Sequence, residues 1–111
     1  MYKRQGEDLD EALHLAQSAV AVAPETPQII DTLGWVYYKR GLSKSAIEQF
    51  QKAIQREPNS GFYHYHLGLA FIQAGDNVRG RTALEQALKN GTNAATAAAI
   101  RRSLEAAPAA R

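Results

Sequence analysis

The sequence repeats itself at a fixed separation, equal to the distance along the chain from Leu33 to Leu67. This periodicity constrains the fold more than any other feature. We call this separation the repeat offset. A period of about 20 to 50 residues is typical of chains built from stacked copies of one small unit, none of which buries its apolar face alone. Three units are in phase, which predicts a stacked repeat architecture. The matching pairs are Leu33 and Leu67, Gly34 and Gly68, Gly41 and Gly75, Ala53 and Ala87, Ala12 and Ala46, Ala19 and Ala53, and Pro24 and Pro58.

Within the units, apolar residues recur at three- and four-residue steps, which is typical of amphipathic helices. Gly34 and Gly68 fall inside such helices. Glycine there costs about 1 kcal/mol relative to alanine, so we expect two helices to approach closely at both positions. We predict helices at residues 8–23, 27–40, 43–56, 61–74, 77–89 and 95–106.

Turn residues separate the predicted helices. Gly41 and Gly75 suit the left-handed conformation that ends a helix. Ser43 and Asp76 are suited to cap the helices that follow, and Thr26 precedes a proline that fits the first helical turn. The predicted connections within each pair of helices are therefore short.

The middle unit resembles the tetratricopeptide repeat (TPR), a helical hairpin of about 34 residues with the pattern W-x2-L-G-x2-Y, then A-x3-F, then P. The third unit keeps most of this pattern, with Thr92 in place of the closing proline, and the first unit keeps only the second half. The middle unit carries Ile30, Leu33, Gly34, Tyr37, Ala46, Phe50 and Pro58 at these positions, and the third carries His64, Leu67, Gly68, Phe71, Gly80, Leu84 and Ala87.

The resemblance implies an all-α fold, a right-handed α-solenoid of antiparallel helix-turn-helix hairpins with about 2.5 repeats and a C-terminal capping helix. Its parts are a partial first repeat at residues 6–26, repeats at 27–60 and 61–94, and the capping helix and tail at 95–111. Because the first repeat lacks its own first helix, we expect Leu9, Leu13 and Ala16 to be left partly exposed.

Residues 1–5 resemble the translation of a transposase sequencing adapter, and we interpret them as a non-native scar. A genuine basic N-terminus is the alternative. On the first interpretation the chain is the C-terminal fragment of a longer protein. Residues 31–38 are similar to the last full repeats of long bacterial TPR proteins, some of them associated with the cell envelope, so the sequence leaves the compartment open.

Charge and composition exclude several classes of partner. Lys3 and Arg4 account for the net charge of +2, and the remaining charged residues are balanced, which argues against a nucleic-acid interface. No apolar run reaches the roughly 18 residues of a membrane span. The chain has no cysteine, hence no thiolate metal site, and no motif for a cofactor.

No catalytic constellation is present either, so we predict that the chain is not an enzyme. His64 and His66 are two residues apart, a spacing that directs side chains to different faces of a helix and disfavours a metal site. We expect His64 to pack in the hairpin interface and His66 to lie near the surface.

The resemblance also implies a concave surface formed by the first helix of each hairpin, where family members hold a peptide or a partner's helix. Aromatic residues on such a surface are enriched among binding hot spots. The alternative for Trp35 and Tyr65 is packing between hairpins. The lysine, arginine and asparagine clamp of chaperone-binding members is absent. The expected binding residues are Gln28, Asp31, Trp35, Tyr38, Lys39, Phe62, Tyr65, His66, Leu69 and Ile72.

We therefore predict a non-catalytic module that binds another protein or peptide, through an apolar or aromatic segment with some basic character near Asp31. A second hypothesis is a structural end-cap of a longer solenoid, whose working surface or catalytic domain lies upstream. The uncovered N-terminal helix also suggests dimerisation.

Overall fold

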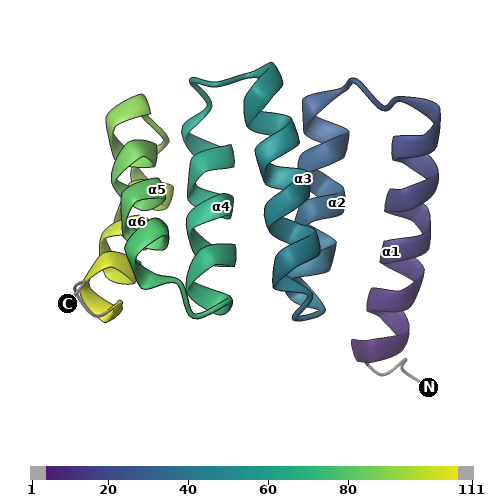
Figure 1. The fold of residues 1–111 in the computed structure, drawn as a ribbon, viewed down its shortest axis with the longest axis horizontal. Coiled ribbons are helices and arrows are strands. Elements are labelled where there is room, and N and C mark those ends of the chain that lie inside the picture. The colour runs from purple at the N-terminus through teal and green to yellow at the C-terminus, as the bar shows by residue number, and fades with distance from the viewer. Residues whose placement is uncertain (1–4, 108–111) are drawn as a thin grey trace.

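The computed structural model describes residues 5–107, with side chains from residue 8 onward, and these residues form six α-helices. Figure 1 shows the helices standing side by side, from the N-terminal helix at one end of the row to the C-terminal helix at the other. They are α1 (Gln5–Val22), α2 (Pro27–Lys39), α3 (Ser43–Arg56), α4 (Gly61–Gln73), α5 (Asn77–Asn90) and α6 (Ala94–Ala106). This is the predicted all-α solenoid, with helix bounds close to those expected. Residues 1–4, most of the proposed scar, lie outside the described residues.

Each helix packs on the next one along the chain, and α2 also touches α4. The α2–α3 and α4–α5 hairpins turn where the repeat pattern places a glycine. Gly41 has a φ of 79°, and its N–H donates to the Tyr38 carbonyl, while the next N–H, from Leu42, donates to Tyr37. The same pair of bonds closes the helix before Gly75, at a φ of 88°. Both expected left-handed caps are confirmed, and each keeps its turn short.

The predictions of the residues that cap the helix starts were only partly correct. Asp76 caps α5 as expected, since its carboxylate accepts from the Arg79 N–H at 3.0 Å. Thr26 is the cap residue of α2 and a proline follows it, but the threonine hydroxyl makes no capping hydrogen bond.

The prediction that Ser43 caps α3 is wrong. The cap residue is Leu42, which lies one repeat offset before the aspartate that caps α5, and its carbonyl already accepts from the Ala46 N–H. Ser43 is thus the first helical residue, and its hydroxyl donates to the Gln73 side chain at 2.7 Å instead. The repeat register, rather than residue type, sets where this helix begins.

The mid-helix glycines lie where two helices meet, as predicted. A Cβ built on Gly34 would be 2.6 Å from Phe50 Cε1, and one on Gly68 would be 2.8 Å from Leu84 Cγ. Phe50 and Leu84 are both fully buried. Each glycine therefore makes room for the large apolar residue of the second helix in its hairpin.

The two ends of the stack differ. At the C-terminal end, Ile100 of α6 is fully buried with Leu84 and Ala87 of α5. At the other end, the expectation of an exposed Ala16 is wrong: it is buried against Leu33 of α2. Leu9 and Leu13 are half-buried, which agrees with the expected partial exposure, and the large apolar side chains of α1 that are exposed are Leu15 and Val22.

The uncovered face of α1 is identified by the repeat itself. Leu15 is equivalent, at the repeat offset, to Gln49 and Ala83. Gln49 borders the close contact at Gly34, and Ala83 is buried in the core. Leu15 is 68% exposed because no first helix covers α1 within the described residues. No helix in this part of the chain has the length and apolar character needed to span a membrane.

Candidate functional site

Four rings from two hairpins meet between α2 and α4. Trp35 and Tyr38 come from α2, with ring centroids 5.1 Å apart, and Tyr65 and His66 come from α4, at 5.6 Å. The Trp35 and His66 rings join the two pairs at 4.7 Å. Tilted rings at these separations attract one another beyond the area they bury. We call these four residues the aromatic cluster; all four are half-buried, so it remains partly open to solvent.

Asp31 fixes His66 within this cluster. The His66 Nδ1 lies 2.8 Å from one carboxylate oxygen of Asp31 and 3.1 Å from the other. Their side chains are 20% and 14% exposed, so the expectation of His66 near the surface is only partly met: it lies at the centre of the cluster. His64 is half-buried and borders a hollow that residues of α5 also line, so the expected packing in the hairpin interface is only partly met; its Nε2 lies 2.8 Å from the Pro58 carbonyl oxygen.

The two histidines therefore face different partners and do not form a metal pair. Within residues 5–107, no three histidine or carboxylate side chains gather in a way that could hold a metal ion.

Trp35 is neither a core residue nor a free surface ring. It is half-buried against the cluster that contains Phe50, and the Lys39 ammonium lies 5.3 Å from its ring centroid. A cation over an indole face is attracted by its negative potential. Both interpretations of Trp35 from the sequence thus describe part of its environment.

Tyr38 is a hydrogen-bond donor at neutral pH. Burial, followed by the neighbouring Tyr65, raises the pKa of the Tyr38 phenol, because both disfavour the negative phenolate. The Tyr38 hydroxyl has no hydrogen-bond partner among residues 5–107. It is therefore available to a ligand.

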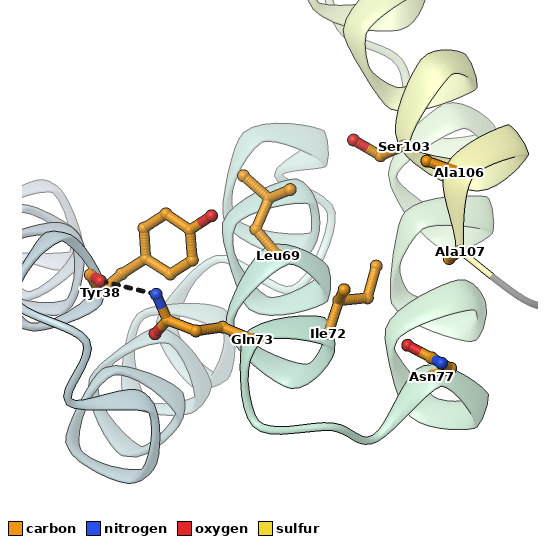
Figure 2. Close-up of a pocket in the computed structure, with 8 residues that line it drawn as sticks. All are labelled: Tyr38, Leu69, Ile72, Gln73, Asn77, Ser103, Ala106 and Ala107. Atoms are coloured by element: carbon orange, nitrogen blue, oxygen red, sulfur yellow. Dashed lines mark hydrogen bonds between the residues drawn. The ribbon is translucent and has the colours of Figure 1, made fainter.

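Beyond Tyr38, the surface opens into a pocket of about 400 Å³ between α2, α4 and α6. Figure 2 shows Tyr38 and Ser103 on opposite sides of Leu69, with Ile72 between α4 and α5. Three of the predicted site residues line it. The full lining is Tyr38, Leu69, Ile72, Gln73, Asn77, Ser103, Ala106 and Ala107.

The α6 side of this pocket was missed in the sequence, although the repeat offset identifies it. Ser103 follows Leu69 by one repeat offset, and Ala106 follows Ile72 by the same separation. Interpreting α6 only as a capping helix hid this equivalence.

Two predicted site residues do not join the others. Gln28 is exposed, and among the described residues its side chain makes no hydrogen bond. Phe62 is 41% exposed and borders a separate hollow at the α3–α4 turn, formed with residues 57–61 and Gly91. The remaining eight are linked through ring contacts, the Lys39–Trp35 contact, the Asp31–His66 hydrogen bond and the lining of the pocket.

Stacked helical hairpins define the class of this protein as an all-α repeat module. The chain belongs to the tetratricopeptide-repeat family, whose model matches residues 32–95, more than half of the sequence. No curated protein matches the chain.

Solved structures share the fold at low sequence identity. The Yersinia enterocolitica type III secretion translocator chaperone SycD, in an alternative dimer, has a TM-score of 0.82 at 16% identity, over 92% of this chain and 80% of that one. PcrH, in complex with the chaperone-binding region of PopD, has a TM-score of 0.81 at 20% identity, over 93% and 80%. The family indicates a protein-interaction module and points toward a protein-binding rather than a catalytic fold, and the neighbours show that other solved proteins share this fold.

Proposed function

We propose that this chain binds a peptide or a partner's helix on the surface formed by α2 and α4. The observation that carries the proposal is the aromatic cluster with its neighbours Leu69 and Ile72, a half-exposed aromatic and apolar surface drawn from two hairpins. Aromatic side chains on such a surface are typical binding hot spots. The structure of PcrH with a region of PopD supports a protein ligand for this fold.

The chemistry of the surface favours an apolar or aromatic segment with a basic residue close to Asp31. Asp31 is the one carboxylate on it, and it contacts His66, whose ring centroid lies 4.7 Å from that of Trp35. An arginine or lysine of the ligand would be attracted by the Asp31 carboxylate and by the faces of the aromatic rings. The basic clamp that holds a peptide's terminal carboxylate in chaperone-binding family members has no counterpart at these positions. A few repeats of this kind support micromolar affinity, about −8 kcal/mol.

The structural end-cap remains the second candidate, and the burial of Ile100 of α6 against α5 favours it. The two roles differ in what Trp35 contributes. A capping module needs Trp35 only for packing, whereas a binding module loses its ligand when the ring is removed.

Trp35 is the only tryptophan in the chain, so its fluorescence reports on this surface directly. The experiment pans a random-peptide display library against the wild-type domain, with Trp35→Ala/Tyr65→Ala as the counter-screen and Phe62→Ala as an aromatic control outside the cluster. We expect enriched apolar peptides that quench or shift Trp35 fluorescence and bind Phe62→Ala normally. A folded wild-type domain that enriches no peptide would favour the end-cap.

The uncovered face of α1 is a proposed site of self-association. Leu15 and Val22 are 68% and 87% exposed on this helix. Light scattering after size-exclusion chromatography, with Leu15→Gln/Val22→Gln as the comparison, tests it. We expect a concentration-dependent dimer that the double variant loses; a monomer at all concentrations would contradict the proposal.

A further inference from the structure

The pocket between α2, α4 and α6 arises from a change of side-chain size along the repeat. At one register position the three first helices carry Trp35, Leu69 and Ser103, and at the next they carry Tyr38, Ile72 and Ala106. These side chains are bulky on α2 and α4 and small on α6. The missing volume on α6 is where the pocket opens.

The floor and rim of the pocket differ in chemistry. Leu69, Ile72, Ala106 and Ala107 supply an apolar lining, and among residues 8–107 no charged side chain lines it. Gln73 is already occupied, since its amide donates to the Tyr38 carbonyl and accepts from a serine hydroxyl.

Three neutral polar groups at the pocket remain available. The Tyr38 hydroxyl, the Asn77 amide and the Ser103 hydroxyl have no hydrogen-bond partner among the described residues. In Figure 2 the Ser103 hydroxyl is directed toward α4, across the opening from Tyr38. Two hydroxyls and an amide provide both donors and acceptors, which is what a peptide backbone requires.

We propose that this pocket anchors one bulky apolar side chain, of leucine or phenylalanine size, from a bound peptide. Tyr38, Asn77 and Ser103 then hold the adjoining backbone of that peptide. The proposal rests on the peptide-binding function above and adds α6 to the surface that performs it. The pocket volume of about 400 Å³ is near the lower end for ligand sites, which suits a single side chain with its backbone.

The lining selects this occupant over others. A charged side chain would lose its hydration without gaining a charged partner, because every described residue of the lining is neutral. An alanine-sized side chain would leave most of the apolar floor uncovered. A second copy of the chain could offer Leu15 or Val22, which are exposed on α1, and self-association is therefore measured as one outcome of the test.

The test titrates the isotope-labelled domain with three neutral probes: N-acetyl-leucine amide, N-acetyl-phenylalanine amide and N-acetyl-alanine amide. Binding is followed by amide and methyl chemical shifts in NMR spectra. The blocking variant is Ala106→Leu, which fills the pocket from α6, and the matched control is Ala95→Leu, another exposed alanine of the same helix.

We expect the leucine and phenylalanine probes to give saturable shifts at Leu69, Ile72 and Ser103, with millimolar dissociation constants. Ala106→Leu should weaken them at least tenfold, and Ala95→Leu should leave them unchanged. Equal shifts with the alanine probe, saturation elsewhere, or normal binding to Ala106→Leu would overturn the proposal. So would line broadening that depends on protein concentration alone and disappears in Leu15→Gln/Val22→Gln, since a second copy would then be the occupant.

Failure of this inference is distinguishable from failure of the proposed function. If displayed peptides require Trp35 and Tyr65 but bind Ala106→Leu as tightly as wild type, the peptide-binding function stands. The pocket is then not part of the binding surface. Probes that bind the pocket when no displayed peptide is enriched would contradict the proposed function and leave a small-molecule site, which also overturns a peptide anchor.

Discussion

The contact between Gly68 and Leu84 allows the packing of the α4–α5 hairpin to be tested quantitatively. A Cβ at position 68 would lie 2.8 Å from both Cγ and Cδ2 of Leu84, and 3.0 Å from the Gly80 carbonyl oxygen. Carbon atoms pack best at about 3.5 to 4.0 Å, so Gly68→Ala forces an overlap of roughly 1 Å. Overpacking of this kind costs about 1 to 3 kcal/mol, and the better helix propensity of alanine returns about 1 kcal/mol. We expect a net loss of about 1 kcal/mol in the free energy of unfolding.

Combining this substitution with Leu84→Ala gives the sharper test. Leu84 is fully buried, so Leu84→Ala alone should cost about 2 to 5 kcal/mol through the cavity it leaves. In the double variant the new methyl group at position 68 occupies part of that cavity. The loss should therefore be smaller than the sum of the single losses, by about 1 to 2 kcal/mol.

The assay is urea unfolding followed by far-UV circular dichroism, with Trp35 fluorescence as a second probe. The matched control is Gly34→Ala with Leu84→Ala, because Gly34 contacts Phe50 in the other hairpin. That pair should be additive within about 0.5 kcal/mol. If Gly68→Ala and Leu84→Ala are equally additive, the two positions are not in contact and the helix packing described above is wrong.

Three further predictions follow from single residues. Gly80→Leu should cost at least about 1 to 3 kcal/mol, because even a Cβ there would lie 2.5 Å from Ile72 Cγ1; an unchanged thermal melt would contradict this. Trp35→Ala should cost about 2 kcal/mol, less than the roughly 3 or more of a fully buried aromatic, and a larger loss on urea unfolding would assign Trp35 to packing alone. The raised pKa of Tyr38 stabilises the folded state fully below the unfolded value of 10.0, and this contribution is lost as pH rises through the folded value. The phenolate absorbance that the wild type shows and Tyr38→Phe lacks should therefore develop with a midpoint above pH 10. A midpoint at or below pH 10 would refute the raised pKa of Tyr38.

Most of the fold was predictable from the sequence because the repeat offset locates the glycines at the turns. These glycines end the helices through local backbone geometry. A left-handed φ at Gly41 and Gly75 ends a helix whatever lies around it. The capping prediction at Ser43 failed because a favourable residue type was preferred to the register, which puts Leu42 at that position. Residue type ranks the candidates for a cap, but the preceding turn decides where the cap lies.

The contacts across repeats could not be predicted in the same way. Asp31 meets His66, which lies one repeat and one residue further along the chain, so no equivalence at the repeat offset joins them. Their contact depends on how far each helix is rotated about its axis in the stack. Helical periodicity identifies the face on which a side chain lies, but it does not determine which side chain of the neighbouring helix it touches.

The two faces of α6 separate the capping role from the proposed binding role. At the positions where α2 and α4 place leucine and glycine to receive a second helix, α6 carries Arg101 and Arg102, both exposed. Two arginines at that position favour contact with water over close helix packing, which suits an end of a solenoid. Ser103 and Ala106 lie on the pocket side and contribute little to this capping. Because the two sets of residues do not overlap, Ala106→Leu can block the pocket while the burial of Ile100, which fixes α6 to the stack, is retained.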